Sequence, residues 1–535
     1  MASETNNKEL LNVLWDGANV LRSKMDANEY KDYLLGIVFY KYLSDTFLVH
    51  AYDLINDGKP SSMEEALESY SEVYNSEDGV DLVKELKDSY HYAISPELTY
   101  TALAKKANFN EFQREDLKRA FNEIEQSDSI FEGLFADVDL YSTRLGTGEQ
   151  KQSATVSELI RTIDAADLLN HDGDVLGDAY EYLIGQFASE TGKKAGEFYT
   201  PQAVSKILTR IAIDGQEDKR GLTVYDPTMG SCSLMLNARK FSSEPEWIRY
   251  FGQELITSTY NLARMNMFLH GVNPSNQRLR NGDTLDADWP SDEPTSFDMV
   301  LMNPPYSQKW SQAQGFLTDP RFSDYGVLAP KTKADYAFLL HGYYHLKNTG
   351  TMAIILPHGV LFRGAAEGKI RQRLIDKGAI YAVIGLPSNL FYNTSIPTCV
   401  IILKKEREGR DVLFIDASKF FTKGKKQNVM TEDDIDKILR LYKDRTDVEK
   451  EAHLATYDEI AKDNDYNLNI PRYVDTFEKE EEIDLSDLTE RMQQTDKEIK
   501  ETETQLIQGL ENLVSSDPAK QTELERFIKL LKEEI

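Results

Sequence analysis

Four consecutive residues, Asn303, Pro304, Pro305 and Tyr306, carry the clearest chemistry in the sequence and directly follow the apolar run 299–302. Proline fixes φ and has no N–H group, so a proline pair offers hydrogen-bond acceptors and no donors. The Asn303 side-chain oxygen and the Pro304 carbonyl can therefore both accept from one amino group, and the Tyr306 ring can stack on the planar molecule that carries it. The tetrapeptide indicates a site that holds an amino group, and a rigid loop after a strand is the alternative.

A second candidate lies where the apolar run Leu222–Tyr225 ends in Asp226 and a turn with Gly230, Ser231 and Cys232 opens a helix. In a doubly wound sheet, the first strand-to-helix turn is where nucleotide-like ligands bind. Gly230 lacks a Cβ, so the backbone there can approach a ligand closely. The turn is a candidate binding loop, and an ordinary strand-to-helix connection is the alternative.

Two acidic residues, Glu254 and Asp283, are further candidates for binding a nucleoside. Glu254 ends the run after Ile248–Gly252, where a carboxylate can accept hydrogen bonds from both hydroxyls of a ribose. Asp283 lies in an Asn-Gly-Asp turn and can accept from the exocyclic amine of a cofactor's adenine. A surface Glu near a helix start and a plain turn are the simpler readings.

The segment GEFYTP, residues 196–201, leads into a predicted helix over Ala203–Ile211. Thr200 fits an N-cap, and Pro201 fits the first helical position. A helix N-terminus there can hold a carboxylate, while capping alone is the alternative.

The elements that must position these residues form an α/β pattern between about residues 170 and 420. Strands are predicted at Leu222–Tyr225, Ile248–Gly252, Met299–Met302, Met352–Leu356, Tyr381–Ile384, Cys399–Leu403 and Val412–Ile415, with helical segments between most of them. This alternation favours an open parallel sheet with crossover helices. Only residues 404–411 separate the last two strands, too few for a helical crossover, so they are predicted to form an antiparallel hairpin at the sheet edge.

The flanking regions are helical by period. Residues 1–165 form a predicted N-terminal helical domain, residues 166–425 the α/β domain, and residues 426–535 a charged C-terminal helical region.

Composition narrows the class of protein. The net charge of −29 over 535 residues excludes a generally basic, DNA-coating protein, but not a DNA enzyme whose grip comes from a partner or one local patch. Two cysteines, Cys232 and Cys399, a polar N-terminus and short apolar runs predict a reducing, cytoplasmic compartment and no membrane span. We find no metal-ligand pattern among the eight histidines.

In order, Phe-Tyr-Thr-Pro, Asp-Pro-x-x-Gly-Ser, a strand-end Glu and Asn-Pro-Pro-Tyr resemble the S-adenosylmethionine-dependent amino-methyltransferases of DNA. Cofactor motifs before the catalytic one are similar to the γ-type N6-adenine enzymes. A longer resemblance, which includes residues 334–338, 355–362, 385–392 and 396–399, is to modification subunits of type I restriction–modification systems. It implies a Rossmann-like doubly wound methyltransferase sheet with an antiparallel edge hairpin and helical flanks.

The resemblance also implies roles for residues. Asn303, Pro304, Pro305 and Tyr306 become catalytic, and Tyr306 stacks on the target base, with Phe391 on its other face or simply in the core. The residues implied to line the cofactor site are Glu197, Phe198, Tyr199, Thr200, Pro201, Gln202, Asp226, Gly230, Ser231, Cys232, Glu254 and Asp283. The family usually has Gly where Cys232 stands, so Cys costs strain if this position needs φ > 0, and an adapted loop is expected.

The implied activity is methyl transfer from S-adenosylmethionine to the N6 amine of an adenine flipped out of DNA, without a metal. Implied partners are DNA, a restriction subunit, and a specificity subunit shared by two copies of this chain, with the C-terminal helices docking on the partner. The lysines at 419, 423, 425 and 426 can touch phosphate or form a solvated loop. Alternatives are a protein-glutamine N5 methyltransferase, cytosine N4 methylation, or a cofactor-binding scaffold subunit without catalysis.

Overall fold

The computed structural model describes residues 2–166, 175–190, 199–392, 395–425, 427–476 and 485–534. The chain divides into two compact units, Met1–Thr476 and Phe477–Ile535, which are described separately.

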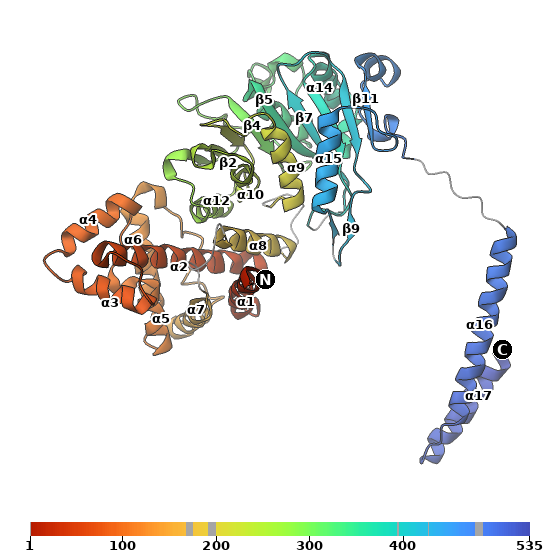
Figure 1. Ribbon diagram of the computed structural model, residues 1–535, viewed down its shortest axis with the longest axis horizontal. Coiled ribbons are helices and arrows are strands. Elements are labelled where there is room, and N and C mark those ends of the chain that lie inside the picture. Colours follow the sequence, from red (N-terminus) through yellow and green to blue (C-terminus); the bar gives the residue numbers. More distant parts are fainter. Residues whose placement is uncertain are drawn as a thin grey trace. The chain divides into compact units, whose positions relative to one another are not determined.

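The N-terminal part of the first unit is helical, as the sequence predicts, and within residues 2–166 the structure has helices and no strand (Figure 1). Leucine, phenylalanine and tyrosine side chains of these helices form one buried core, which also takes in Leu262, Met265 and Leu269 of the helix α12 (Thr257–Leu269). The helices within this range are α1 (Ala2–Arg22), α2 (Ala27–Asn56), α3 (Met63–Tyr74), α4 (Gly79–Tyr90), α5 (Tyr100–Asn108), α6 (Arg114–Ser127) and α7 (Glu149–Asp164). The next helix, α8 (Val175–Glu190), contributes to the same core.

A nine-stranded sheet follows, with strand order β11-β8-β6-β7-β5-β4-β1-β2-β3. Its strands are β1 (Thr223–Asp226), β2 (Arg249–Glu254), β3 (Gln277–Asn281), β4 (Phe297–Met302), β5 (Leu346–Pro357), β6 (Ile380–Gly385), β7 (Thr398–Lys404), β8 (Val412–Asp416) and β11 (Ala452–Ala455). Pairs β3–β2, β2–β1, β1–β4, β4–β5 and β6–β8 are parallel. The chain order reverses between β4 and β1, so this sheet has its topological switch point there, at the carboxyl ends where ligands bind.

The doubly wound α/β class is confirmed, but the predicted pairing of the last two strands is wrong. β7 lies between β5 and β6 and is antiparallel to both, while β8 pairs with β6 and with the edge strand β11. The antiparallel hairpin is therefore β6–β7 inside the sheet, and the antiparallel edge pair is β8–β11. The link 404–411 is long enough to cross one intervening strand, because neighbouring strands lie only about 5 Å apart.

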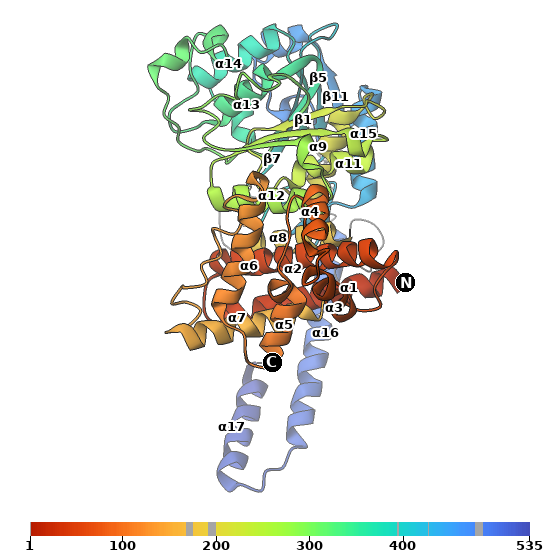
Figure 2. The ribbon, with the colours of Figure 1, turned by 90° about the vertical axis from the view of Figure 1, so that its left-hand side faces the viewer.

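Helices cover both faces of the sheet. Consecutive residues of β4 alternate between the two cores, since Met299 and Leu301 belong to one and Val300 and Met302 to the other. The first core includes α9 (Gln202–Ile213) and α15 (Glu432–Asp444), and the second includes α13 (Asp335–Tyr344) and α14 (Ala365–Asp376) (Figure 2). Short helices α10 (Ser233–Leu236) and α11 (Ala238–Phe241) follow β1, α12 (Thr257–Leu269) follows β2, and β9 (Thr422–Lys423) pairs with β10 (Asn428–Val429).

Two elements beyond the sequence-based boundary at residue 426 belong to the sheet body. β11 is its edge strand, and α15 is tied to α9 by the ion pairs Arg210–Asp436, at 2.6 Å, and Lys206–Glu432. The compact unit accordingly ends at Thr476 rather than before α15.

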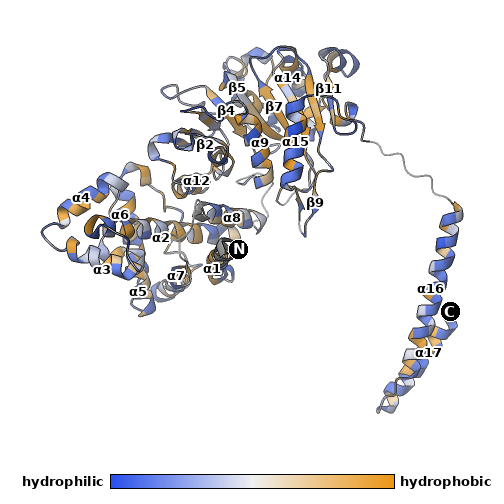
Figure 3. Cartoon of the chain, in the orientation of Figure 1, coloured by the Kyte–Doolittle hydropathy of each residue, from blue (hydrophilic) through white to orange (hydrophobic). Residues whose placement is uncertain are grey.

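The second unit is a pair of helices, α16 (Leu485–Glu511) and α17 (Pro518–Glu534), linked by the ion pair Lys532–Glu511 at 2.6 Å. Polar and apolar positions alternate along both helices (Figure 3). Large apolar side chains remain exposed on them, among which are Leu488, Met492, Ile499, Leu506, Phe527 and Leu530. Among the described residues, no helix is both long enough and apolar enough to cross a membrane.

Candidate active site

The carboxyl ends of β1, β2 and β4 bring the candidate motifs together around two cavities. The larger, about 190 Å³, is lined by Glu254, Asp283, Asn303 and Pro305, and the smaller by Tyr199, Thr200, Asp226, Gly230, Ser231 and Asn303. Asn303 and Thr228 line both cavities, so the amide side chain stands where the two meet.

The amide of Asn303 is held on both sides. Its Nδ2 donates to Oγ1 of Thr200 at 3.0 Å, and its Oδ1 accepts from the hydroxyl of Tyr306 at 3.0 Å. Asn303 is only 5% exposed, so the hydrogen bond to Thr200 is sheltered from water. Because the NH₂ group of the Asn303 amide donates to Thr200, the amide oxygen is the group that can accept a hydrogen bond from a ligand, beside the one from Tyr306.

The expected capping role of Thr200 is wrong. α9 begins at Gln202 with Pro201 in the N-cap position, and no side chain caps it. The Thr200 hydroxyl is therefore available to Asn303, and the two motifs are joined directly. Glu197 and Phe198, also expected near the cofactor, lie outside the described residues.

Gln202 joins the same region through a buried polar chain. Its Nε2 donates to Glu181 of α8 at 3.1 Å, and Glu181 also accepts from Asn266 of α12 at 2.6 Å. Asn266 in turn donates to the carbonyl of Ser231 at 2.8 Å. Helices on either side of the turn after β1 thereby fix its position, and burial raises the pKa of Glu181.

The turn after β1 is a tight strand-to-helix turn that passes through the left-handed region at Gly230, as its sequence suggests. Asp226 accepts from the N–H and hydroxyl of Thr228 at 2.8 and 3.1 Å, which closes the turn at the strand end. Burial raises the pKa of Asp226 to about 7, and nearby Glu254 acts in the same direction. Gly230 has φ +54°, in the left-handed region that glycine adopts without strain.

Cys232 meets the condition for strain. It has φ +66° and is fully buried at the start of α10. A residue with a Cβ costs about 1 kcal/mol or more in this region, whereas glycine would be relaxed here.

The two acidic residues also line the larger cavity. Glu254 accepts from the N–H groups of Ile256 at 2.8 Å and of Gly230 at 3.2 Å, which ties the end of β2 to the β1 turn. Asp283 uses one oxygen, Oδ1, to accept from the N–H of Leu285 at 2.9 Å. Each carboxylate therefore shapes its own loop as well as facing the cavity.

Phe391 lies beside Tyr306, with ring centroids 6.3 Å apart and an edge-to-face angle of 80°. Phe391 is 2% exposed and belongs to the core on the α9 side of the sheet. Tyr392 packs instead near Tyr199, at a centroid distance of 5.9 Å. The structure thus places Phe391 in the core and at the Tyr306 ring together.

Several residues at the cavity were not predicted. Leu255 and Ile256 are 51% and 43% exposed beside it, and Gln253 and Phe338 also line it. The sequence contains a signal for Leu255 and Ile256: two apolar residues directly follow a strand-end Glu. Apolar side chains at the solvent edge of a pocket suit a flat ligand.

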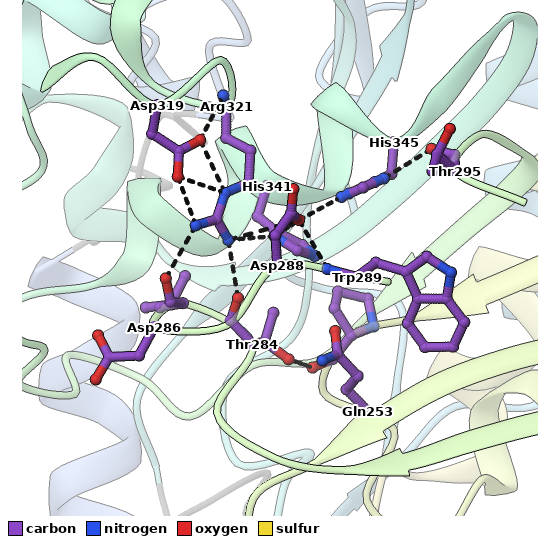
Figure 4. A network of polar contacts seen from close by, with 12 residues as sticks. Gln253, Thr284, Asp286, Asp288, Trp289, Thr295, Asp319, Arg321, His341 and His345 are labelled. Atoms are coloured by element: carbon purple, nitrogen blue, oxygen red, sulfur yellow. Dashed lines mark hydrogen bonds and ion pairs between the residues drawn. The ribbon is translucent and has the colours of Figure 1, made fainter. Parts of the chain in front are cut away.

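A polar network lies on the face of the sheet that α13 covers (Figure 4). Ligand-type atoms of Asp288, His341 and His345 lie within 4.8 Å of one another, a grouping that the sequence did not reveal. Arg321 donates to Nδ1 of His341 at 3.1 Å and lies 3.7 Å from Asp288, so a guanidinium already occupies this group. The arrangement is an ion-pair network rather than an open set of metal ligands.

Two family models match the chain. The N-6 DNA Methylase model matches residues 171–482, and the HsdM N-terminal domain model matches residues 10–163.

Two curated relatives match over most of their length. The type I restriction enzyme MpnII methylase subunit of Mycoplasma pneumoniae is 35% identical over 88% of this chain and 90% of that protein. The MjaVIII methylase subunit of Methanocaldococcus jannaschii is 33% identical over 90% of this chain and 81% of that protein.

Two solved structures of type I subunits are also similar to this chain. A type I restriction-modification system methyltransferase subunit from Streptococcus thermophilus is 60% identical, with TM-score 0.85, over 88% of this chain and 100% of that one. A modification subunit of a putative type I restriction enzyme from Vibrio vulnificus, 17% identical with TM-score 0.59 over 88% of this chain and 97% of that one, shares the fold.

Proposed function

The chain belongs to the N-6 DNA methylase family, and from this premise we propose that it is the modification subunit of a type I restriction–modification system. Its reaction would be methyl transfer from S-adenosylmethionine to the N6 amine of adenine in DNA. The observation that carries the proposal is the place of Asn303, at the junction of two cavities with its amide oxygen directed by Thr200.

The donors around the larger cavity fit S-adenosylmethionine. Glu254 supplies two carboxylate oxygens for ribose hydroxyls, and Asp283 keeps Oδ2 for an adenine amine while Oδ1 holds its loop. Leu255 and Ile256 offer apolar surface to a flat base. Asp226, Gly230 and Ser231 of the smaller cavity are polar groups of the kind that bind the amino-acid end, but this cavity, about 10 Å³, holds no more than one water and would have to widen to admit it. When bound, the cofactor supplies an electrophilic methyl group on a positively charged sulfur.

The chain's own residues would activate the target amine. The N6 lone pair of adenine is delocalised into the ring, so the amine is a poor nucleophile. Asn303 Oδ1 and the Pro304 carbonyl would accept from its two hydrogens, which favours a pyramidal nitrogen and aims its lone pair. The gain is orientation plus electrostatic stabilisation of the charge that develops on nitrogen.

Tyr306 would hold the base that carries this amine. Its ring is positioned by the prolines before it, and its edge is supported by Phe391 at a centroid distance of 6.3 Å. A paired adenine cannot present its amine, so the target base would be flipped out of the duplex. Stacking on an aromatic ring is worth about 1–3 kcal/mol per base, which offsets part of the unpairing cost.

The β9–β10 hairpin supports a contact with DNA close to Phe391, beside the proposed position of the target base. Asn428 donates through Nδ2 to the carbonyl of Ser388 at 2.8 Å and through its N–H to that of Asn389 at 2.9 Å, just before Phe391. The hairpin carries the exposed lysines 423 and 425, and residues 417–429 contain no acidic side chain. Phosphates flanking a flipped base would meet these lysines, whereas the chain as a whole is strongly acidic.

The helical pair α16–α17 would bind the specificity subunit. Its apolar residues Leu488, Met492 and Ile499 recur at helical spacing and are exposed in the second unit. Such faces pair with apolar faces of partner helices. We further propose two copies of this chain per specificity subunit and a restriction subunit that joins them.

The test is transfer of labelled methyl from S-adenosylmethionine to DNA by the full chain, with and without its specificity subunit. N6-methyladenine formed only with the partner supports the proposal, and Asn303→Ala should abolish it while cofactor binding remains. Equal transfer without the partner would contradict the role of α16–α17. Labelled protein or N4-methylcytosine instead of N6-methyladenine would contradict the proposed substrate, and unchanged transfer by Asn303→Ala would contradict the mechanism.

A further inference from the structure

We propose that Arg321 is a positioning residue of the cofactor site, which holds the loop that recognises the cofactor's adenine. The inference rests on the proposed function, because it takes the larger cavity to be the S-adenosylmethionine site. Arg321 lies in the segment 303–334 that begins with the catalytic tetrapeptide and ends at α13, yet it lines neither cavity.

Arg321 is a buried cation with unusually complete hydrogen bonding. It is 2% exposed, and its guanidinium pairs with Asp319 at 2.7 Å. The other donors go to the carbonyls of Thr284 at 2.9 Å and Leu285 at 3.1 Å and to Nδ1 of His341. Figure 4 shows Arg321 among Asp319, Thr284 and His341. A planar guanidinium can bind two successive carbonyls in a fixed fork, which an ammonium group cannot do.

Those carbonyls belong to the loop that carries Asp283. Gly282, Asp283 and Thr284 all line the larger cavity. The hydroxyl of Thr284 donates to the carbonyl of Pro227 at 2.5 Å, and the N–H of Gly282 donates to the carbonyl of Glu254 at 2.9 Å. The loop is therefore fixed from the cavity side by the β1 and β2 turns and from behind by Arg321.

A second route links Arg321 to the cavity through β1. A guanidinium only donates, so Nδ1 of His341 accepts from it at 3.1 Å and the ring proton resides on Nε2. That proton is directed to the hydroxyl of Tyr225 at 2.8 Å, which donates to Oε1 of Gln253 at 3.1 Å. Burial lowers the pKa of His341 well below its usual range, in agreement with a neutral ring. Gln253 itself lines the cavity.

The test compares the full chain with Arg321→Lys for binding of S-adenosylhomocysteine and S-inosylhomocysteine, measured by calorimetry. The second compound has an oxo group where adenine has its amine, so the ratio of the two affinities reports how well the loop presents its acceptor. We expect the preference for the adenosyl compound to fall about tenfold in Arg321→Lys, the equivalent of one well-placed hydrogen bond. A loss of stability alone would lower both affinities equally.

Arg371 provides a matched control. It is also buried and donates to the main-chain carbonyls of Tyr466 at 2.7 Å, Arg363 at 2.9 Å and Val360 at 3.1 Å, none of which lines either cavity. Arg371→Lys should lower the unfolding temperature and leave the affinity ratio within twofold of wild type.

Each outcome of this comparison supports or overturns the inference about Arg321. An unchanged ratio in Arg321→Lys, or an equal fall in Arg371→Lys, overturns the inference while the proposed function stands. Wild-type chain that binds neither compound overturns the proposed function itself. Where Arg321→Lys does not fold, Asp319→Asn replaces it, because the asparagine keeps the loop's hydrogen-bond acceptor and weakens only the ion pair. Its ratio should fall about threefold, and no fall contradicts the role of Arg321.

Discussion

Replacing Thr200 by valine changes one group at the candidate site, because a methyl takes the place of the hydroxyl that accepts the Asn303 amide at 3.0 Å. The two side chains have nearly the same shape, so packing around this buried residue is kept. The amide of Asn303 then has no acceptor for Nδ2 in its present orientation. A half-turn of the amide would relieve this and present Nδ2, instead of the oxygen, to the target amine.

The magnitude follows from the cost of an unsatisfied buried donor, about 1–3 kcal/mol. In Thr200→Val, the reactive orientation of Asn303 carries this cost, whereas the reversed orientation does not. At about 1.4 kcal/mol per tenfold, the rate of the methyl-transfer step should fall roughly 5- to 150-fold. Cofactor affinity should change little, since the hydroxyl is already used by Asn303.

The assay is single-turnover methyl transfer to DNA at saturating cofactor, with cofactor binding measured in parallel by calorimetry. Thr200→Ser is the matched control, because serine restores an oxygen at the same position and should recover most of the rate. Wild-type transfer by the valine variant would refute the positioning argument. So would an equal loss in the serine variant, because serine keeps the hydroxyl and the loss could then not be assigned to the hydroxyl.

Three further predictions follow from the described residues. Cys232→Gly should unfold with a free energy about 1 kcal/mol higher than Cys232→Ala in urea titrations, because only the alanine keeps a Cβ at φ +66°; the reverse order would show that the turn is unstrained. Burial raises the pKa of Asp226 to about 7, and a cofactor cation favours its carboxylate, so affinity for S-adenosylmethionine should rise up to about tenfold from pH 6 to pH 8. The Asp226→Asn variant should bind S-adenosylmethionine with an affinity that does not rise with pH in this way. A variant whose affinity follows the same pH profile as the wild type in calorimetry would contradict the assignment. Burial tends to raise the pKa of Asp298, but hydrogen bonds from Lys219 and Lys347 hold it below the usual range, so its contribution to stability is present at neutral pH and is lost as pH falls below about 4. Asp298→Ala should therefore cost about 3 kcal/mol of unfolding free energy at pH 7 and clearly less at pH 3, and an equal cost at both would contradict the ion-pair argument.

The convergence of the motifs could be predicted because it depends on one property of parallel sheets. The carboxyl ends of β1, β2 and β4 lie at the same edge, so residues that end or directly follow those strands must be close. Asp226, Glu254 and Asn303 each occupy such a position, and all three line the cavities there. A residue at the end of a strand reaches this edge as soon as its strand joins the sheet.

Strand neighbours could not be predicted in the same way. The short link 404–411 indicates that β7 and β8 run in opposite directions, which is so, but it does not say whether a third strand lies between them. β6 lies there because its parallel pairing with β8 and its antiparallel pairing with β7 bury it on both sides. Loop length restricts the distance and direction between two strands, whereas adjacency depends on all the strands that compete for the same edge.

Thr200 and Arg321 show a different limit of motif reading. The sequence Thr-Pro before a helix predicts a cap, yet Pro201 itself occupies the N-cap position and the hydroxyl turns to Asn303, a residue in another motif. Arg321 belongs to no motif and reaches the cavity through the carbonyls of Thr284 and Leu285 and through the buried side chain of His341. Main-chain carbonyls have no side-chain identity, so a residue that acts on them leaves no pattern at its target. Residues that touch a ligand can be inferred from type and spacing, whereas residues that position a loop from behind are found only when the folded chain shows which carbonyls a buried cation meets.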